Sequence, residues 1–319
     1  MKSVEELRQF YKRQLVTDLQ VLEERRKGVV NKLIYAGIGL GCIALIPILL
    51  LFATFGPNPF LILVPLVLCV LLGVGLYKLL TSGYVVDFKH MVIERVVKFI
   101  HEGLVYQPRS YISKPIYLAS QIFRTKPDRY RGDDLVKGRL GNTEVEFCEI
   151  HSEYKTHDKN GTHWHTIFKG LFFIGDFNKH FTCQMVVLPD KAERLFGHIG
   201  KMLQSWNLAR DELIKLEDTE FERLFVVYGS DQIQARYILS PSLMQRIVEF
   251  RQKTGRDIYL SFQLSKVFVA IPYKKDLFEP KIFRSVLDFG PIREYYEDLL
   301  LALGIVEDLD LNTRIWSKE

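Results

Sequence analysis

Two long apolar runs near the start of the chain constrain its fold more than any other feature. Residues 33–55 are 23 residues without a charge, and residues 60–77 are another 18. The second run extends to Leu80 because Lys78 can carry its ammonium to the membrane interface on a flexible stem. About 20 apolar residues cross a hydrocarbon core of roughly 30 Å as a helix. We therefore expect a transmembrane unit at 33–80, with spans at 33–55 and 60–80.

The residues between the runs predict that the two helices form an antiparallel hairpin. They are Gly56-Pro57-Asn58-Pro59. Glycine and proline cannot continue a helix here, and four residues suffice for a turn. The alternatives are two buried core helices or a cleaved signal peptide. A signal peptide would not start after about 30 polar residues and precede a second span.

Basic residues predict that both termini of this multi-pass chain are cytoplasmic. Residues 1–80 hold nine Lys or Arg against five Asp or Glu, whereas the remaining chain holds 34 against 33. Basic residues flank both spans, and the connecting turn carries no charge, which follows the positive-inside rule. Because the basic excess is confined to the first 80 residues, a generic nucleic-acid binder is excluded and no nucleic-acid partner is expected.

The interior of the spans predicts an anchor in the lipid bilayer rather than a transporter. No Asp, Glu, His or Arg interrupts either span, so nothing polar is available to line a pore or relay protons. Small residues that permit close helix packing are Gly37, Gly39, Gly41, Gly73 and Gly75. Such surfaces favour a homo-oligomer.

An apolar stripe predicts that residues 1–32 form an amphipathic cytosolic helix. Ser3 and Glu6 match a capping box, and apolar residues recur every three or four positions. The expected contact residues are Leu7, Tyr11, Leu15, Leu19 and Leu22. This stripe must be buried against the chain's own soluble domain, a second copy, or a partner helix. A position on the lipid surface is less favoured, because the polar face carries nearly as much acid as base.

Residues 81–142 are expected to contain a membrane-proximal helix and a connector. Residues 87–102 have helical periodicity and continue the second span. Residues 106–142 contain three prolines and the sequence Arg131-Gly132-Asp133-Asp134, which favours irregular structure with a turn.

From residue 143 onwards, the sequence predicts a cytosolic α+β domain spanning 143–319. The apolar period changes to two, and strands are expected at 143–151, 165–177, 181–188, 224–228, 233–239, 257–262 and 267–271. Helices are expected at 189–204, 240–255 and 291–303. Strands and helices in mixed runs, without βαβ alternation, predict the α+β class. The domain is one unit or two lobes, 143–205 and 219–303.

Three groups of polar residues are candidate sites. His151, His163 and His165 offer a metal site, because residues two apart on a strand share a face and a third ligand could come from across a hairpin. Arg129 and Arg131 offer an anion-binding loop. The competing interpretations, which we favour, are solvated hairpin histidines and a turn whose charges pair internally. Glu144, Glu146 and Glu149 similarly fit exposed strand-face carboxylates better than acid–base work.

No short catalytic motif occurs, so an enzyme is the less favoured class and no cofactor is expected. The four cysteines lack paired spacing, which favours reduced structural thiols.

Several segments in a fixed order resemble one protein family. They are Pro127–Asp134 with Lys137-Gly138, Phe168–Phe173, Asp176–Lys179, Val187–Asp190, Glu220–Tyr228 and Gln232–Pro241. Preceded by a two-span hairpin, they resemble a bacterial family catalogued as a domain of unknown function (number three-one-three-seven), over about residues 1–275.

The resemblance implies a bacterial inner-membrane protein without established activity, often encoded near LemA-type membrane proteins. It therefore implies a LemA-type protein as a partner, and it supplies no catalytic residues. The histidine-rich insert at 151–165 lies outside the resembling pattern.

The leading hypothesis is a membrane-anchored protein-interaction or scaffold protein that self-associates. Helices 1–28 and 87–102 would form its stalk. The alternatives are a lipid-binding domain, with the run Phe168–Phe177 lining a groove, and a metal-dependent hydrolase that uses His151, His163 and His165.

Overall fold

The computed structural model describes residues 2–56, 59–159, 161–177, 182–190 and 212–312. They fall into two compact units. The first unit comprises Met1–Val96 and Phe278–Tyr295, and the second comprises Val97–Leu277 and Tyr296–Glu319. We describe each unit by itself.

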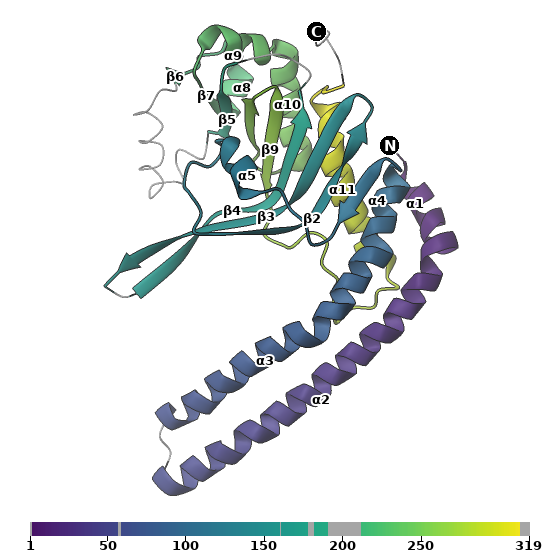
Figure 1. The fold of residues 1–319 in the computed structure, drawn as a ribbon, viewed down its shortest axis with the longest axis vertical. Coiled ribbons are helices and arrows are strands. Elements are labelled where there is room, and N and C mark those ends of the chain that lie inside the picture. Colours follow the sequence, from purple (N-terminus) through teal and green to yellow (C-terminus); the bar gives the residue numbers. More distant parts are fainter. Residues whose placement is uncertain (1, 57–58, 160, 178–181, 191–211, 313–319) are drawn as a thin grey trace. The chain divides into compact units, whose positions relative to one another are not determined.

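Two long helical segments build the first unit (Figure 1). The first runs through α1 (Val4–Phe10), the π turn η1 (Tyr11–Leu15) and α2 (Val16–Phe55). The second runs through α3 (Pro59–Phe88), the π turn η2 (Lys89–Ile93) and α4 (Glu94–Ile100), so the helix predicted at 87–102 does continue the second span. Both segments are long and apolar enough to cross a membrane, and no residue of their most apolar windows is buried.

The predicted helix start and apolar stripe are both present in the first segment. Ser3 and Glu6 form a reciprocal capping box at α1. The four leucines of the stripe, Leu7, Leu15, Leu19 and Leu22, are fully buried. Tyr11 is half-buried, and its hydroxyl donates to the Leu287 carbonyl at 2.6 Å. The four leucines therefore belong to a hydrophobic core of the chain itself.

The π turn η1 explains how a stripe with this spacing stays on one side. Leu7, Tyr11, Leu15 and Leu19 follow at intervals of four residues. In an α-helix of 3.6 residues per turn, such a stripe drifts steadily around the axis. At η1 the Val16 amide bonds back five residues to Tyr11. This wider turn absorbs part of the drift.

The predicted irregular connector at 106–142 is wrong. It contains part of β1 (Leu104–Gln107), then α5 (Lys114–Ala119) and β2 (Arg129–Leu140). The sequence Arg131-Gly132-Asp133-Asp134 lies inside β2, where the register shifts between Asp133 and Val136. The prolines that favoured irregular structure lie outside the strands or, like Pro115, in the first turn of α5, where proline is tolerated.

The second unit contains one nine-stranded sheet in the order β1-β2-β3-β4-β9-β8-β5-β7-β6 (Figure 1). The remaining strands are β3 (Thr143–Asp158), β4 (Gly161–Asp176), β5 (Met185–Pro189), β6 (Glu212–Leu213), β7 (Phe225–Gly229), β8 (Tyr259–Gln263) and β9 (Lys266–Pro272). All neighbouring strands are antiparallel. The α+β class is confirmed, and strands from both predicted lobes lie in the same sheet.

The helices that follow are α8 (Thr219–Leu224), α9 (Gln232–Ile238), α10 (Pro241–Thr254) and α11 (Phe289–Asp308). Of these, α10 and α11 match the sequence expectation, whereas α8 and α9 were not expected as helices. Residues 233–239 were expected as a strand but form most of α9, because the Asp231 side chain accepts from the amides of Ile233 and Gln234 and caps a helix. The helix expected at 189–204 lies almost entirely outside the described residues.

The middle of the sheet is buried on both faces. On one face, α5 packs its fully buried Tyr117 against Phe172 and Phe123. The Tyr117 hydroxyl lies 2.9 Å from the hydroxyl of Ser152 on β3. Side chains alternate between faces along a strand, and Phe173, which follows Phe172, is equally buried. The sheet is therefore a rigid platform for the polar groups at its margins.

Candidate functional site

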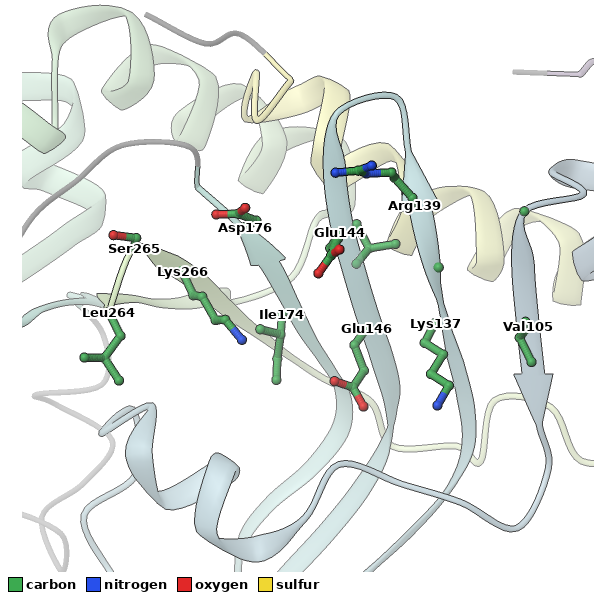
Figure 2. A pocket seen from close by; sticks show the side chains of 13 residues that line it. Val105, Lys137, Arg139, Glu144, Glu146, Ile174, Asp176, Leu264, Ser265 and Lys266 are labelled. Carbon is green, nitrogen blue, oxygen red and sulfur yellow. The ribbon is translucent and has the colours of Figure 1, made fainter. Parts of the chain in front are cut away.

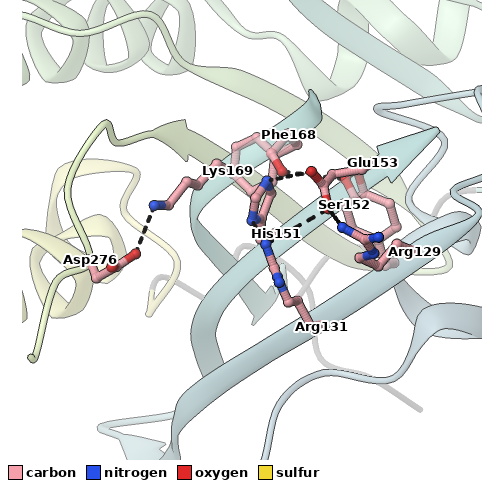
Figure 3. A network of polar contacts seen from close by, with 9 residues as sticks. Arg129, Arg131, His151, Ser152, Glu153, Phe168, Lys169 and Asp276 are labelled. Atoms are coloured by element: carbon pink, nitrogen blue, oxygen red, sulfur yellow. Dashed lines mark hydrogen bonds and ion pairs between the residues drawn. The ribbon is translucent and has the colours of Figure 1, made fainter. Parts of the chain in front are cut away.

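The two arginines of the predicted anion site are engaged by a neighbouring carboxylate (Figure 3). The Arg129 guanidinium lies 3.2 Å from the Glu153 carboxylate and 3.9 Å from the ring centroid of Trp164. The Arg131 guanidinium lies 3.7 Å from the same carboxylate and 2.8 Å from Nδ1 of His151. These contacts favour internal pairing over an open anion-binding loop.

The three candidate metal ligands do not come together. His163 lies 3.2 Å from the Asp158 carboxylate, and His165 lies 2.8 Å from the Thr156 hydroxyl. His151 pairs with Lys169 across the hairpin, four residues along β4 from His165, a separation of roughly 13 Å. Within the described part of the chain, these histidines share no set of three ligand atoms within 4.8 Å.

The aromatic side chains of the run Phe168–Phe177 do not line a groove, contrary to the lipid-binding alternative. Phe168, Phe172, Phe173 and Phe177 are each at most 5% exposed. Phe168 and Phe172 belong to the hydrophobic core beneath α5. These rings stabilise the sheet and offer no surface to a lipid.

A buried carboxyl group is the feature that the sequence interpretation missed. Glu149 is 6% exposed and accepts a hydrogen bond from the Leu277 amide at 2.8 Å. Burial raises the pKa of Glu149 from 4.5 to about 8, and the nearby carboxyls of Asp133, Asp276 and Asp134 act in the same direction. Glu149 therefore holds a proton at neutral pH.

Asp276, next to Glu149, stays ionised. Burial alone would raise its pKa, but the Lys169 ammonium at 2.7 Å lowers the pKa of Asp276 overall (Figure 3). Glu149 thus carries the proton of the pair, and Asp276 carries the negative charge. A signal for this site is present in the sequence: Glu149 is odd-numbered like Val145 and Phe147, and so shares their buried face rather than that of Glu144 and Glu146.

An open groove of about 660 Å³ lies on the face of the sheet that α5 partly covers, opposite the face that carries Glu149 (Figure 2). The groove lies beside the part that α5 covers. Cross-strand neighbours of opposite charge line it. They are Lys137 with Glu146, Arg139 with Glu144, and Lys266 with Asp176. Val105 and Ile174 add apolar surface.

The chain is similar to one solved structure and to one family profile. Among solved structures, the chain is similar to the mycobacterial trehalose monomycolate transport factor A, with 11% identity and a TM-score of 0.31. The alignment covers 66% of this chain and 94% of that chain. No curated protein matches the chain.

A family comparison confirms the resemblance seen in the sequence. The profile of the family described as "Protein of unknown function (DUF3137)" matches residues 166–311, from β4 to the residues just beyond α11. The match does not include the helical hairpin or the segment at 127–138. Residues 166–311 of this chain are therefore similar to the DUF3137 family, whose function is unknown.

Proposed function

We propose that the chain is a scaffold protein of the bacterial inner membrane that binds other proteins, including its own copies, without catalysis. The observation that carries the proposal is the pair of long helices in whose most apolar windows no residue is buried. Large apolar side chains there are exposed, such as Tyr35 at 75% and Leu79 at 72%. A soluble protein rarely leaves so much contiguous apolar surface in water.

The proposed orientation puts both termini and the sheet domain in the cytoplasm, on the basis of the basic flanks. A C-terminal fusion to a fluorescent protein should fluoresce, whereas a C-terminal fusion to alkaline phosphatase should be inactive. Insertion of the phosphatase at the 56–59 turn should give activity. Active phosphatase at the C-terminus contradicts this orientation.

Self-association is supported by unused small-residue surfaces on the spans. A Cβ atom added at Gly37, Gly39, Gly41 or Gly75 would meet nothing within 4 Å. These glycines therefore do not serve the packing of the hairpin on itself, and a second copy can approach them closely. Cys42, next to Gly41, is exposed and can report such an approach.

Oxidative cross-linking in native membranes tests the self-association. We expect a disulfide-linked dimer that disappears in Cys42→Ser and weakens in Gly41→Leu. The volume-conserving change Ile38→Leu on the same helix is the control and should leave the dimer unchanged. A monomeric mass in detergent, together with no cross-link, rules out the self-association.

The sheet domain would supply the surface for other proteins, and the open groove of Figure 2 is the region that supports this part of the proposal. A LemA-type membrane protein is the partner proposed from the family resemblance. Photo-cross-linking from position 146 in the groove should capture it in native membranes, and cross-linking from position 233 on α9 is the control. Equal capture from both positions would count against the groove.

A further inference from the structure

One loop of the first unit exposes an aromatic side chain between two basic ones. Phe283 is 74% exposed, and its neighbours Lys281 and Arg284 are also exposed. Ile282 between them is 5% exposed, so the loop itself is firmly packed. A single exposed apolar residue needs no explanation. Phe283 does need one, because its loop packs beside the proposed membrane-spanning helices, close to where the spans begin.

The loop is fixed against α2 by polar contacts on both sides of Phe283. The Arg26 guanidinium donates to the Ile282 carbonyl at 2.9 Å, and the Glu23 carboxylate accepts from the Val286 amide at 3.0 Å. Arg26 and Glu23 also form an ion pair at 2.7 Å. The hydrogen bond from Arg26, together with that from Val286, lowers the pKa of Glu23 to about 2 despite its burial. This pair therefore stays charged and holds the loop at neutral pH.

These contacts show that the loop dips toward the spans and returns. Arg26, which holds Ile282, is seven residues before the first span begins at Leu33, or about 10 Å along the helix axis. Glu23, which holds Val286, is about 15 Å away by the same measure. On the other side of the loop, Glu279 pairs at 2.7 Å with Lys89, nine residues beyond the second span and about 13 Å from it.

Phe283 and Arg284 therefore lie at the turn of the loop nearest the spans. The Arg284 amide donates to the Lys281 carbonyl at 2.9 Å and closes this turn. The polar headgroup layer adds about 5 to 8 Å on each side of the hydrocarbon core. A phenylalanine side chain that starts about 10 Å from the core can reach into this layer.

We propose that residues 281–284 form a membrane-interface wedge. Phe283 enters the headgroup layer, and Lys281 and Arg284 bind the anionic headgroups of phospholipids. This inference rests on the proposed membrane anchoring. It adds a lipid contact made by Phe278–Tyr295, the segment that lies in sequence between the two parts of the sheet domain. Apolar side chains of interfacial segments enter this boundary, and nearby basic residues strengthen the contact with anionic lipid.

The charges around the loop fit an anionic surface. Exposed lysines at the same end of the spans are Lys27, Lys32 and Lys78. Lys281 also pairs with Glu294 at 3.0 Å, but both side chains are nearly half exposed. Such a surface pair is weak and can give way to a headgroup phosphate. Each basic group near an anionic membrane strengthens binding about fivefold.

Tryptophan fluorescence of the full chain in vesicles tests the wedge. Phe283→Trp is compared with Tyr35→Trp inside the first span and with Val21→Trp, an exposed position of α2 about 18 Å before that span. Each difference spectrum against the unsubstituted protein is measured in phosphatidylcholine vesicles, with and without phosphatidylglycerol. Brominated phosphatidylcholine serves as the quencher.

We expect quenching of Phe283→Trp and Tyr35→Trp but not of Val21→Trp. Phosphatidylglycerol should increase quenching of Phe283→Trp, and the added changes Lys281→Gln and Arg284→Gln should abolish that increase. If Tyr35→Trp is quenched and Phe283→Trp is not, the wedge is refuted. If phosphatidylglycerol has no effect, headgroup binding is refuted. If Tyr35→Trp is not quenched either, the proposed membrane anchoring fails.

Discussion

The carboxyl group of Glu149 should make the stability of the sheet domain fall as the pH rises. Burial raises the pKa of Glu149 from 4.5 to about 8. The folded state therefore binds this proton more tightly than the unfolded state does. The resulting stabilisation is complete below about pH 4.5 and is lost progressively as the pH approaches about 8.

The size of the effect follows from that shift. At about 1.36 kcal/mol per pKa unit, the free energy of unfolding should fall by about 4 to 5 kcal/mol across this window. A domain of this size loses about 2 to 4 °C of Tm per kcal/mol, so the Tm should fall by roughly 10 °C or more. Asp276 does not contribute here, because its pKa is lowered from 3.8 and it is ionised across the whole window.

Glu149→Gln removes the titration and retains an oxygen that can accept from the Leu277 amide. Thermal unfolding of the full chain in detergent, followed by near-ultraviolet circular dichroism, should show a Tm that falls from about pH 5 to about pH 8 in the unsubstituted protein. In Glu149→Gln this fall should be absent. Glu144→Gln, an exposed change on the other face of β3, should behave like the unsubstituted protein. Parallel pH profiles for the unsubstituted protein and Glu149→Gln would falsify the assignment of the proton to Glu149.

Three further experiments probe packing by thermal unfolding. Gly170→Ala should cost more than about 3 kcal/mol, because its Cβ would lie 2.2 Å from a backbone oxygen of β9 at a φ of +151°. Gly161→Ala at the hairpin tip, where a Cβ has open space, should cost about 1 kcal/mol, and equal costs would contradict this reasoning. Leu19→Ala should cost about 2 to 5 kcal/mol because the side chain is fully buried, whereas Val21→Ala, at 45% exposure, should be nearly neutral. If the two changes cost the same, Leu19 is not a core residue. Tyr117→Phe should cost about 1 to 3 kcal/mol through loss of a buried hydrogen bond, and an unchanged Tm would show that this bond is dispensable.

The elements that could be predicted from the sequence are those whose signals are local. The two long apolar helices follow from uninterrupted apolar length. The helix starts at Ser3 and at Ser240-Pro241 follow from capping chemistry within four residues, and both are present in the structure. The apolar stripe on α1 and α2 could be recognised for the same reason, because a helix brings residues three or four apart to one side.

The elements that were missed depend on residues far away in the sequence. β2 looks like a polar loop, but pairing with β3 and β1 satisfies its backbone. The histidines share local spacing, yet the strand register decides their neighbours and keeps His151 apart from His165. The alternation with Val145 and Phe147 places Glu149 on a buried face, but nothing close in sequence shows that the chain around Leu277 covers it.

The π turns at Tyr11–Leu15 and Lys89–Ile93 have a consequence for how relatives of this chain can differ in length. Each π turn is equivalent to one residue inserted into an α-helix, which rotates everything beyond it by about 100°. A relative that lacks one residue in only one of these turns would change the phase between the buried side of that helix before the turn and its exposed apolar side beyond it. A length change at either place should therefore come with a compensating shift of the apolar pattern in the same helix.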